Sequence, residues 1–184
     1  MQPPMPQRSA PTSTPMRRSP IAALAACAVA LTGCRHPTPK PDPQPADRIV
    51  IVKSTHTLTL YAHGHPIHTY RVALGRGTGA AKVREGDHNT PEGLYAIDAR
   101  NAHSHFHRAL HISYPNAADR EQAAKLGAPP GGDIMIHGLR NGLGWLGSLQ
   151  RHVDWTDGCI ALTDAEMDQV WEEVPIGTPV EIRH

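Results

Sequence analysis

Short apolar runs separated by turn residues make up most of the chain from residue 48 onward. Residues 49–52 form one such run, and in the next stretch Leu58 and Leu60 alternate with threonines. Because period-two alternation and short apolar runs between turn residues are typical of strands, this pattern predicts a mostly β domain. Further strands are expected at residues 70–74, 94–97, 134–136, 160–162 and 180–182, with a glycine-rich, charged loop over residues 75–89.

Two segments carry helix signals instead. Residues 116–126 begin with an asparagine that can cap a helix, continue with alanines, Glu and Lys, and stop before Gly127. The second segment begins with the capping box Thr163-Asp164-Ala165-Glu166, and its apolar residues then recur on one helical face until Pro175. We therefore expect one mostly β domain over residues 48–183 with two peripheral helices.

Residues 1–33 predict a secretory signal peptide. Met16 precedes two arginines, residues 21–31 are apolar and uncharged, and the segment ends at Cys34. Basic and apolar regions in this order are typical of such signals. The residues before Cys34 resemble a bacterial lipoprotein signal, which implies that Cys34 is lipidated and becomes the mature N-terminus. An ordinary signal peptide that leaves Cys34 as a plain thiol is the alternative, and Met16 is a possible true start.

Both interpretations place the domain in the cell envelope, outside the cytoplasm. Prolines at alternate positions within residues 34–47 predict an extended linker of about 3.1 Å per residue and roughly 30 Å of reach. Such a linker holds a lipid-anchored domain away from the membrane surface. Arg35 rather than aspartate follows Cys34, which favours the outer over the inner membrane for a periplasm-facing lipoprotein.

Length and charge exclude several classes of protein. The chain has 184 residues, with 18 Lys+Arg against 17 Asp+Glu and a formal net charge of +1. This length excludes a multidomain machine, and the balanced charge argues against a protein that binds nucleic-acid phosphates. No stretch approaches the roughly 18 to 20 apolar residues of a membrane-spanning helix. The predicted contact with the membrane is therefore the lipid anchor.

Cysteine usage indicates one candidate nucleophile. The chain has three cysteines, of which Cys27 leaves with the signal and Cys34 is the predicted lipidation site, so the domain keeps Cys159 alone. An unpaired cysteine in an oxidising compartment is a liability, so one that is retained is a candidate for catalysis. A buried, inert cysteine that packs as a small hydrophobe is the alternative.

A histidine at the end of an apolar strand is the candidate base. His137 follows residues 134–136 and precedes Gly138, while Gly158 precedes Cys159. An imidazole within reach can take the proton of a thiol, and the Gly138 backbone carbonyl can orient the ring. Gly158 permits a tight backbone that aims the N–H groups of Gly158 and Cys159 at a developing oxyanion. Taken alone, His137 also fits a strand-end histidine with no chemical role.

Three motifs in this order resemble the catalytic domain of the bacterial L,D-transpeptidases, the YkuD-domain family. They are Gly86 with Thr90-Pro91-Glu92-Gly93, then Ile134-Met135-Ile136-His137-Gly138, then Asp157-Gly158-Cys159-Ile160-Ala161-Leu162. The resemblance covers residues 48–183 and implies a β-sandwich-like catalytic fold, a nucleophile at Cys159, a base at His137 and no cofactor. It also implies that the thiolate attacks the third residue of a peptidoglycan stem peptide, releases D-alanine and forms a thioester, which an amine acceptor converts into a cross-link.

The chain departs from the commonest form of the family signature in two places. Thr156-Asp157 stands where Ser-His is common, and Ala161 stands where an arginine is common. The missing guanidinium removes a bidentate partner for a substrate carboxylate. Asp157 adds a negative charge that tends to raise the pKa of Cys159. This form resembles a YafK-like subgroup with hydrolytic members, so transfer to an amine and hydrolysis of stem-peptide linkages both stay open.

Four residues near the two motifs are candidates for substrate binding. Asp157 adjoins the cysteine turn, and Trp155 offers a ring that can stack on sugar or peptide. Arg140 and Arg151 lie between the motifs and are candidates for the substrate carboxylate that Ala161 cannot bind. Packing for the tryptophan and a solvated surface position for each arginine are the alternatives.

Two classes of function that do not use a catalytic cysteine are also alternatives. His103, His105 and His107 alternate as they would on one face of a strand, with His111 nearby, and imidazole is a common zinc or copper ligand. A periplasmic metal-binding lipoprotein is therefore an alternative, although no metal site is assigned. A wall-binding module that holds peptidoglycan without catalysis is another, and the pairing of His137 with Cys159 argues against it.

Overall fold

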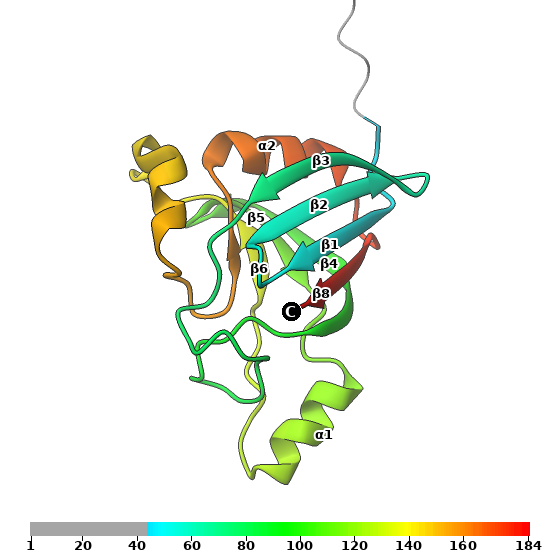
Figure 1. Cartoon of the computed structure of the whole chain (residues 1–184), viewed down its shortest axis with the longest axis vertical. Helices are drawn as coiled ribbons and strands as arrows, with labels where there is room; N and C mark the ends of the chain where they lie inside the picture. The colour runs from blue at the N-terminus through cyan, green and yellow to red at the C-terminus, as the bar shows by residue number, and fades with distance from the viewer. Residues whose placement is uncertain (1–43) are drawn as a thin grey trace, which may run out of the picture. The chain divides into compact units, whose positions relative to one another are not determined.

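The computed structural model describes residues 44–184, so the predicted signal, Cys34 and most of the proline-rich linker lie outside the described residues. Eight strands form one sheet in the order β3-β2-β1-β8-β4-β5-β6-β7 (Figure 1). This confirms the prediction of a mostly β domain. The strand bounds are β1 Arg48–Val52, β2 Thr57–Ala62, β3 His65–Arg71, β4 Gly93–Ser104, β5 His107–Ile112, β6 Met135–His137, β7 Ile160–Ala161 and β8 Pro179–Arg183.

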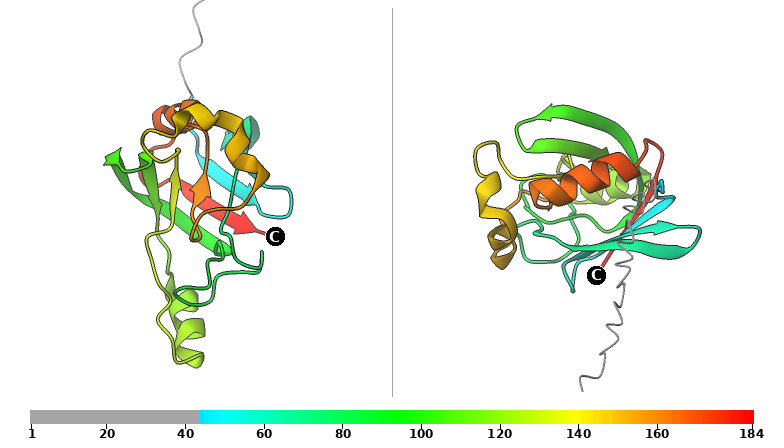
Figure 2. Two further views of the ribbon diagram at one scale, coloured as in Figure 1. Left: turned by 90° about the vertical axis from the view of Figure 1, so that its left-hand side faces the viewer. Right: turned by 90° about the horizontal axis from the view of Figure 1, so that it is seen from above.

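The sheet curls until its last strand meets the chain that leaves β3. Ala73 and Ala161 exchange two backbone hydrogen bonds, with N···O distances of 3.0 and 2.8 Å. The pairs β1–β8 and β6–β7 are parallel, and the other neighbouring pairs are antiparallel. Two halves of a single curled sheet thus face each other across the core, which is the form that the expected sandwich-like packing takes (Figure 2).

The β4–β5 hairpin is longer than the sequence pattern predicts. β4 continues past Ile97 to Ser104, and β5 follows after a short turn. The far part of β4 is largely exposed and polar, and β5 carries an arginine and two histidines among its apolar residues. Because neither stretch shows a clean apolar alternation, hydrophobic patterning could not detect them.

Both predicted helices are present, and they occupy different environments. The first, α1 Ala117–Lys125, is capped by Asn116 and buries one residue, Ala123, so it is peripheral. The second, α2 Asp164–Glu173, begins at the predicted capping box. It lies in the mouth of the curled sheet, where Met167 and Val170 are fully buried, so it is more central than predicted (Figure 2).

A third helical segment was not predicted. The 3₁₀ helix η1 spans Gly144–His152 and is interrupted at Gly147, whose φ is 49°. Leu143 precedes it without a side-chain cap. Since helix starts are recognised in sequence from capping side chains, an uncapped helix with an internal glycine leaves little signal.

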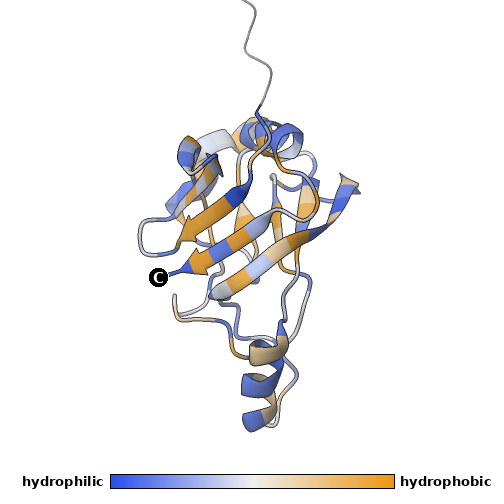
Figure 3. Cartoon of the chain, turned by 90° about the vertical axis from the view of Figure 1, so that its right-hand side faces the viewer, coloured by the Kyte–Doolittle hydropathy of each residue, from blue (hydrophilic) through white to orange (hydrophobic). Residues whose placement is uncertain are grey.

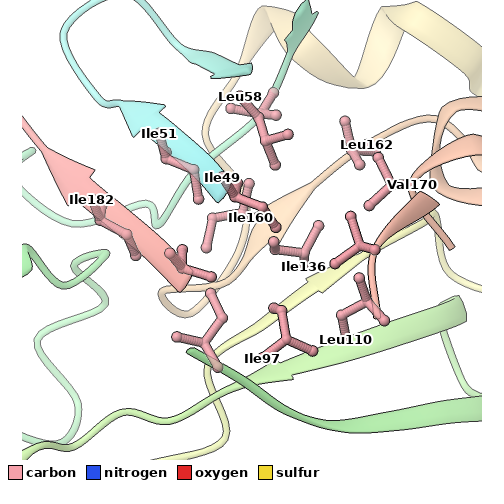
Figure 4. Close-up of a cluster of buried hydrophobic side chains, with 14 of the residues drawn as sticks. Ile49, Ile51, Leu58, Ile97, Leu110, Ile136, Ile160, Leu162, Val170 and Ile182 are labelled. Atoms are coloured by element: carbon pink, nitrogen blue, oxygen red, sulfur yellow. The ribbon is translucent and has the colours of Figure 1, made fainter. Parts of the chain in front are cut away.

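Isoleucine and leucine side chains from both halves of the sheet fill the core (Figure 4). The alternation of apolar and polar residues along the strands is visible in Figure 3. Full burial of each such side chain stabilises the fold by about 1.5–3 kcal/mol. Within residues 44–184 no helix has the length and apolar character to cross a membrane.

Candidate active site

The parallel pair β6–β7 brings His137 and Cys159 to one cavity. The register places Ile136 beside Ile160 and His137 beside Ala161. His137 is the last residue of β6, and Cys159 directly precedes β7. Both line a cavity of about 430 Å³, together with Asn101, His103, Ser104, His105, Phe106, Asp133, Met135, Trp155, Thr156 and Asp157.

The His137 ring is held from one side by its own backbone. Its Nδ1–H donates to the Gly138 carbonyl oxygen at 2.6 Å, which is the contact that the sequence predicts. Since a carbonyl only accepts, Nδ1 carries the proton and Nε2 keeps the lone pair of a neutral imidazole. Burial lowers the pKa of His137, and the bond to the Gly138 carbonyl opposes this in part. His137 is therefore neutral and suited to accept a proton at Nε2.

Two aromatic side chains fix the other faces of this imidazole. The Phe106 ring centroid lies 4.7 Å from that of His137. The Trp155 ring stands edge-on to His137 at 5.7 Å, and its Nε1–H donates to Gln150 Oε1 at 2.8 Å. Gln150 is buried on η1 and donates in turn to the Ala161 carbonyl. The helix η1 thus supports the wall of the cavity beside His137.

Cys159 is a protonated thiol in the resting site. Its Sγ donates to the Asp133 carbonyl oxygen at 3.5 Å. Burial is the main cause that raises the pKa of the Cys159 thiol, and the charges of Asp157 and Asp133 add to it. The backbone N–H of Met135 and the ammonium of Lys82 act in the opposite direction. A thiol in this environment needs a base to become a nucleophile.

A hydroxyl braces the turn that presents Cys159. Thr156 Oγ1 donates to the Cys159 carbonyl at 2.8 Å and accepts from the Gly158 N–H at 3.2 Å. Gly158 has a φ of +128°, and a Cβ there would lie 2.7 Å from the Asn89 carbonyl oxygen, so only glycine fits. The Gly158 N–H, which the sequence predicts to face an oxyanion, donates to the Thr156 hydroxyl in this structure. The Cys159 N–H has no hydrogen-bond partner within residues 44–184.

Asp157 lies at the mouth of the cavity in an ion cluster. It accepts from Arg76 Nε at 3.0 Å and lies 2.8 Å from His88 Nδ1. The hydrogen bond from Arg76 lowers the pKa of Asp157, and His88 contributes to the same effect. Arg76 and His88 belong to the loop 75–89, and they could not be assigned to the site from sequence alone. Arg76 supplies a guanidinium beside the cysteine turn, where Ala161 supplies none.

Arg140 and Arg151, which the sequence analysis names as candidates for substrate binding, do not line the cavity that contains Cys159. Arg151 pairs with Glu166 of α2 and is mostly buried, so its guanidinium is used inside the fold and the prediction that it binds substrate is wrong. Arg140 is exposed and lines a second groove of about 470 Å³. This groove shares Phe106 and Trp155 with the cysteine cavity and is otherwise mainly lined by leucines.

The histidine-rich segment does not form a ligand cluster. β4 ends at Ser104 and β5 begins at His107, so the three alternating histidines do not share one strand. His103 and His105 line the cysteine cavity, whereas His107 Nε2 lies 2.7 Å from Asp168 Oδ1. Within residues 44–184 no group of three or more His, Cys, Asp or Glu side chains is arranged to hold a metal ion.

The match to a known protein family agrees with this geometry. Residues 46–182 match the L,D-transpeptidase catalytic domain (YkuD). The chain therefore belongs to the L,D-transpeptidase catalytic-domain family, as the three sequence motifs indicate.

A curated relative and two solved structures illustrate the similarity. The chain is 27% identical over 132 residues to the protein named "Putative L,D-transpeptidase YafK" of Escherichia coli (strain K12), covering 68% of this chain and 46% of the relative. It thus spans about half the length of that relative. The helical cell shape determining protein Pgp2 of Campylobacter jejuni shares its fold with a TM-score of 0.58 at 23% identity, covering 76% of this chain and 48% of Pgp2. An L,D-transpeptidase of Xylanimonas cellulosilytica has a TM-score of 0.52 at 19% identity, covering 79% of this chain and 64% of that structure.

Proposed function

We propose that the chain is a peptidoglycan L,D-transpeptidase in which Cys159 is the nucleophile and His137 the general base. One observation carries the proposal: a thiol and a neutral imidazole line the same cavity, and a backbone carbonyl fixes the imidazole so that Nε2 keeps its lone pair. Family membership supports the substrate class, which is a peptidoglycan stem peptide.

The first step moves one proton and forms one bond. Cys159 turns from the Asp133 carbonyl, its proton passes to His137 Nε2, and Sγ attacks the carbonyl carbon of the third stem residue. Since the thiol pKa is raised and the imidazole pKa lowered, a preformed ion pair is disfavoured, and proton transfer accompanies the attack. The Cys159 N–H is the backbone donor left to stabilise the oxyanion.

The second step breaks the peptide bond and regenerates the base. The tetrahedral intermediate collapses, His137 returns the proton to the leaving nitrogen of D-alanine, and a thioester on Cys159 remains. An acceptor amine then attacks the thioester carbonyl while His137 takes its proton, which passes to the sulfur as the new amide forms. Water in place of the amine gives hydrolysis and a tripeptide product.

Charges at the mouth of the cavity support recognition of an anionic peptide. Arg76 is more than half exposed and already binds one carboxylate, that of Asp157. Its guanidinium lies beside the cysteine turn and is a candidate partner for the substrate carboxylate that Ala161 cannot bind. Asp157 orients Arg76, and Trp155 contributes an aromatic ring to the lining of the same cavity. Arg140 borders the neighbouring groove and suits a carboxylate at the other end of the substrate or on the acceptor.

The proposal includes an envelope location. The signal-like residues 1–33 and Cys34 support a lipid-anchored protein that faces the periplasm, with the outer membrane favoured by Arg35. Expression of the full chain and of Cys34→Ser in a Gram-negative host tests this part. The parent should fractionate with membranes and incorporate labelled palmitate. If the Cys34→Ser variant does both equally, Cys34 is not the anchor.

Product analysis tests the reaction. The purified full chain is incubated with tetrapeptide muropeptides, and the products are identified by mass spectrometry beside Cys159→Ala as the matched control. A cross-linked dimer that lacks one D-alanine, absent with Cys159→Ala, is the expected result. Tripeptide without dimers would show a hydrolase of the same fold. Products that form equally with Cys159→Ala would contradict a role for the thiol.

A further inference from the structure

One peptide group lies between His137 and a carboxylate of α2. His137 Nδ1–H donates to the Gly138 carbonyl at 2.6 Å. The N–H of Leu139 belongs to the same peptide group and donates to Asp164 Oδ1 at 2.8 Å. In a trans peptide the C=O and N–H point in opposite directions, so the two hydrogen bonds lie along one dipole. The imidazole, the peptide and the carboxylate therefore form a continuous chain.

Two glycines allow the carboxylate to come this close. A Cβ on Gly138 would lie 2.7 Å from Asp164 Oδ1 and 2.9 Å from His107 Cβ. A Cβ on Gly144 would lie 2.3 Å from Asp164 Oδ2. Any side chain at either position would displace Asp164 from the peptide. The glycines at positions 138 and 144 therefore leave room for the Asp164 carboxylate itself, and not only for helix α2 as a whole.

The start of α2 determines where the carboxylate lies. Thr163 caps the helix, and Asp164 is its first residue, where helix N–H groups favour negative charge. The Leu162 N–H donates to the His137 carbonyl at 2.8 Å. This hydrogen bond joins the segment before α2 directly to His137. Because the capping box already uses Thr163 and Glu166, the Asp164 side chain is free to bind the peptide.

We propose that Asp164 is a positioning residue for His137, acting through the Gly138–Leu139 peptide to orient the imidazole and stabilise the imidazolium that forms during catalysis. This inference rests on the proposed function, since it assigns His137 as the base. A carboxylate on the N–H side strengthens the C=O as an acceptor, because hydrogen bonds in a chain polarise one another. The arrangement performs the task of the carboxylate in a catalytic triad, with a peptide group in between.

Several other titratable groups near His137 can also affect its pKa, so a test of Asp164 has to keep them unchanged as far as possible. His103 and His105 come from the β4–β5 hairpin, Asp133 precedes β6, and Asp157 and Cys159 belong to the cysteine turn. On the side of Gly138 lies His107, which is paired with Asp168 of α2. A comparison of two aspartates on α2 leaves all of these groups in the protein, and of the two substitutions Asp168→Asn alone changes the partner of His107.

The Asp164→Asn substitution removes the charge and keeps an oxygen that accepts from Leu139. We expect a loss of about tenfold in kcat/KM for release of D-alanine, well short of the ~10⁴-fold seen when a directly bonded triad carboxylate is neutralised. The acid limb of kcat/KM should shift to lower pH by about half a pH unit, since an imidazolium without the charge is less stable. Asp168→Asn is the matched control, because it removes a carboxylate one turn further along α2 and should leave both quantities unchanged.

Nuclear magnetic resonance tests the same relay without relying on activity. In the ¹⁵N-labelled wild-type chain, the Leu139 amide resonance should titrate together with the His137 imidazole, which is assigned by its loss in His137→Gln. The His137 pKa should be lower in Asp164→Asn than in Asp168→Asn. A Leu139 resonance that stays fixed while His137 titrates, or equal His137 pKa values in the two variants, would overturn the inference. Absence of turnover with intact coupling would instead count against the proposed reaction alone.

Discussion

Thr156 Oγ1 donates a 2.8 Å hydrogen bond to the carbonyl of Cys159, three residues further on. The same hydroxyl accepts from the N–H of Gly158, so one side chain closes the turn that presents Cys159. This turn is also fixed from outside, because the Arg76 N–H donates to the Thr156 carbonyl at 2.9 Å. The geometry of Cys159 therefore depends on a residue with no chemical role of its own.

Replacing Thr156 with valine should separate turn geometry from chemistry. Valine keeps the shape and leaves the buried Gly158 N–H and the partly buried Cys159 carbonyl without their partner, which costs about 1–3 kcal/mol in the free energy of unfolding. We expect a lower kcat as well, because the Cys159 backbone is released. Urea unfolding and steady-state kinetics measure both effects. Thr156→Ser keeps the hydroxyl and should retain both properties, and a Val variant as stable and active as the Ser variant would contradict this role.

The buried neutral His137 predicts a specific dependence of stability on pH. Its pKa is lowered by burial in the folded state, so below about pH 6.5 the unfolded chain binds a proton that the folded site resists. The contribution of His137 to stability is thus present above about pH 6.5 and is lost as the pH falls through the lowered pKa. Thermal unfolding between pH 7.5 and pH 5 should show a smaller decrease for His137→Gln than for wild type. Equal decreases would show that His137 protonates as readily in the folded state as in the unfolded chain.

Asp157 should reduce the reactivity of the thiol. Its charge is one of the causes that raise the pKa of Cys159, although the carboxylate is 72% exposed and paired with Arg76. In Asp157→Asn we therefore expect a modest increase, about two- to threefold, in the rate of Cys159 alkylation by iodoacetamide at pH 7.5. Glu121→Gln on α1 is the matched control and should react at the wild-type rate. A slower reaction in Asp157→Asn would contradict the assigned sign.

Arg140 and Arg151 should behave differently although they lie close in sequence. Arg151 is paired with Glu166 in a partly buried position, so Arg151→Ala should lower the free energy of unfolding by about 1–3 kcal/mol, the order of a lost hydrogen bond to a charged group. Arg140 is exposed, and Arg140→Ala should leave stability within about 0.5 kcal/mol. A higher KM for a stem tetrapeptide in Arg140→Ala would support substrate contact. An unchanged KM would remove Arg140 from the substrate-binding residues.

The residues predicted from sequence are those whose surroundings are local. Gly138 follows His137 and Gly158 precedes Cys159, so each candidate catalytic side chain and the glycine beside it can be recognised together in a short stretch of sequence. The strand pattern also favours proximity of His137 and Cys159 in the fold, because both motifs adjoin predicted apolar strands. The pairing of β6 with β7 then places them at one cavity.

The residues that sequence could not assign depend on long-range contacts. Arg76 reaches Asp157 because Gly75 bridges to Thr156 across the fold, and no local pattern in the loop 75–89 predicts that pairing. Asp164 was recognised only as part of a capping box, although its side chain contacts Leu139. Arg151 was misassigned because proximity in sequence to the motifs does not reveal that Glu166 faces it.

Mass spectrometry of the acylated protein tests directly whether Cys159 forms a thioester with the stem peptide. The full chain is mixed with a tetrapeptide muropeptide, quenched in acid at short times and digested to locate the adduct. We expect a transient adduct on Cys159 equal in mass to the substrate less D-alanine, absent in Cys159→Ala and formed much more slowly in His137→Gln. Product formation by wild type without an adduct on Cys159 at any time, or an adduct on another residue, would contradict this expectation.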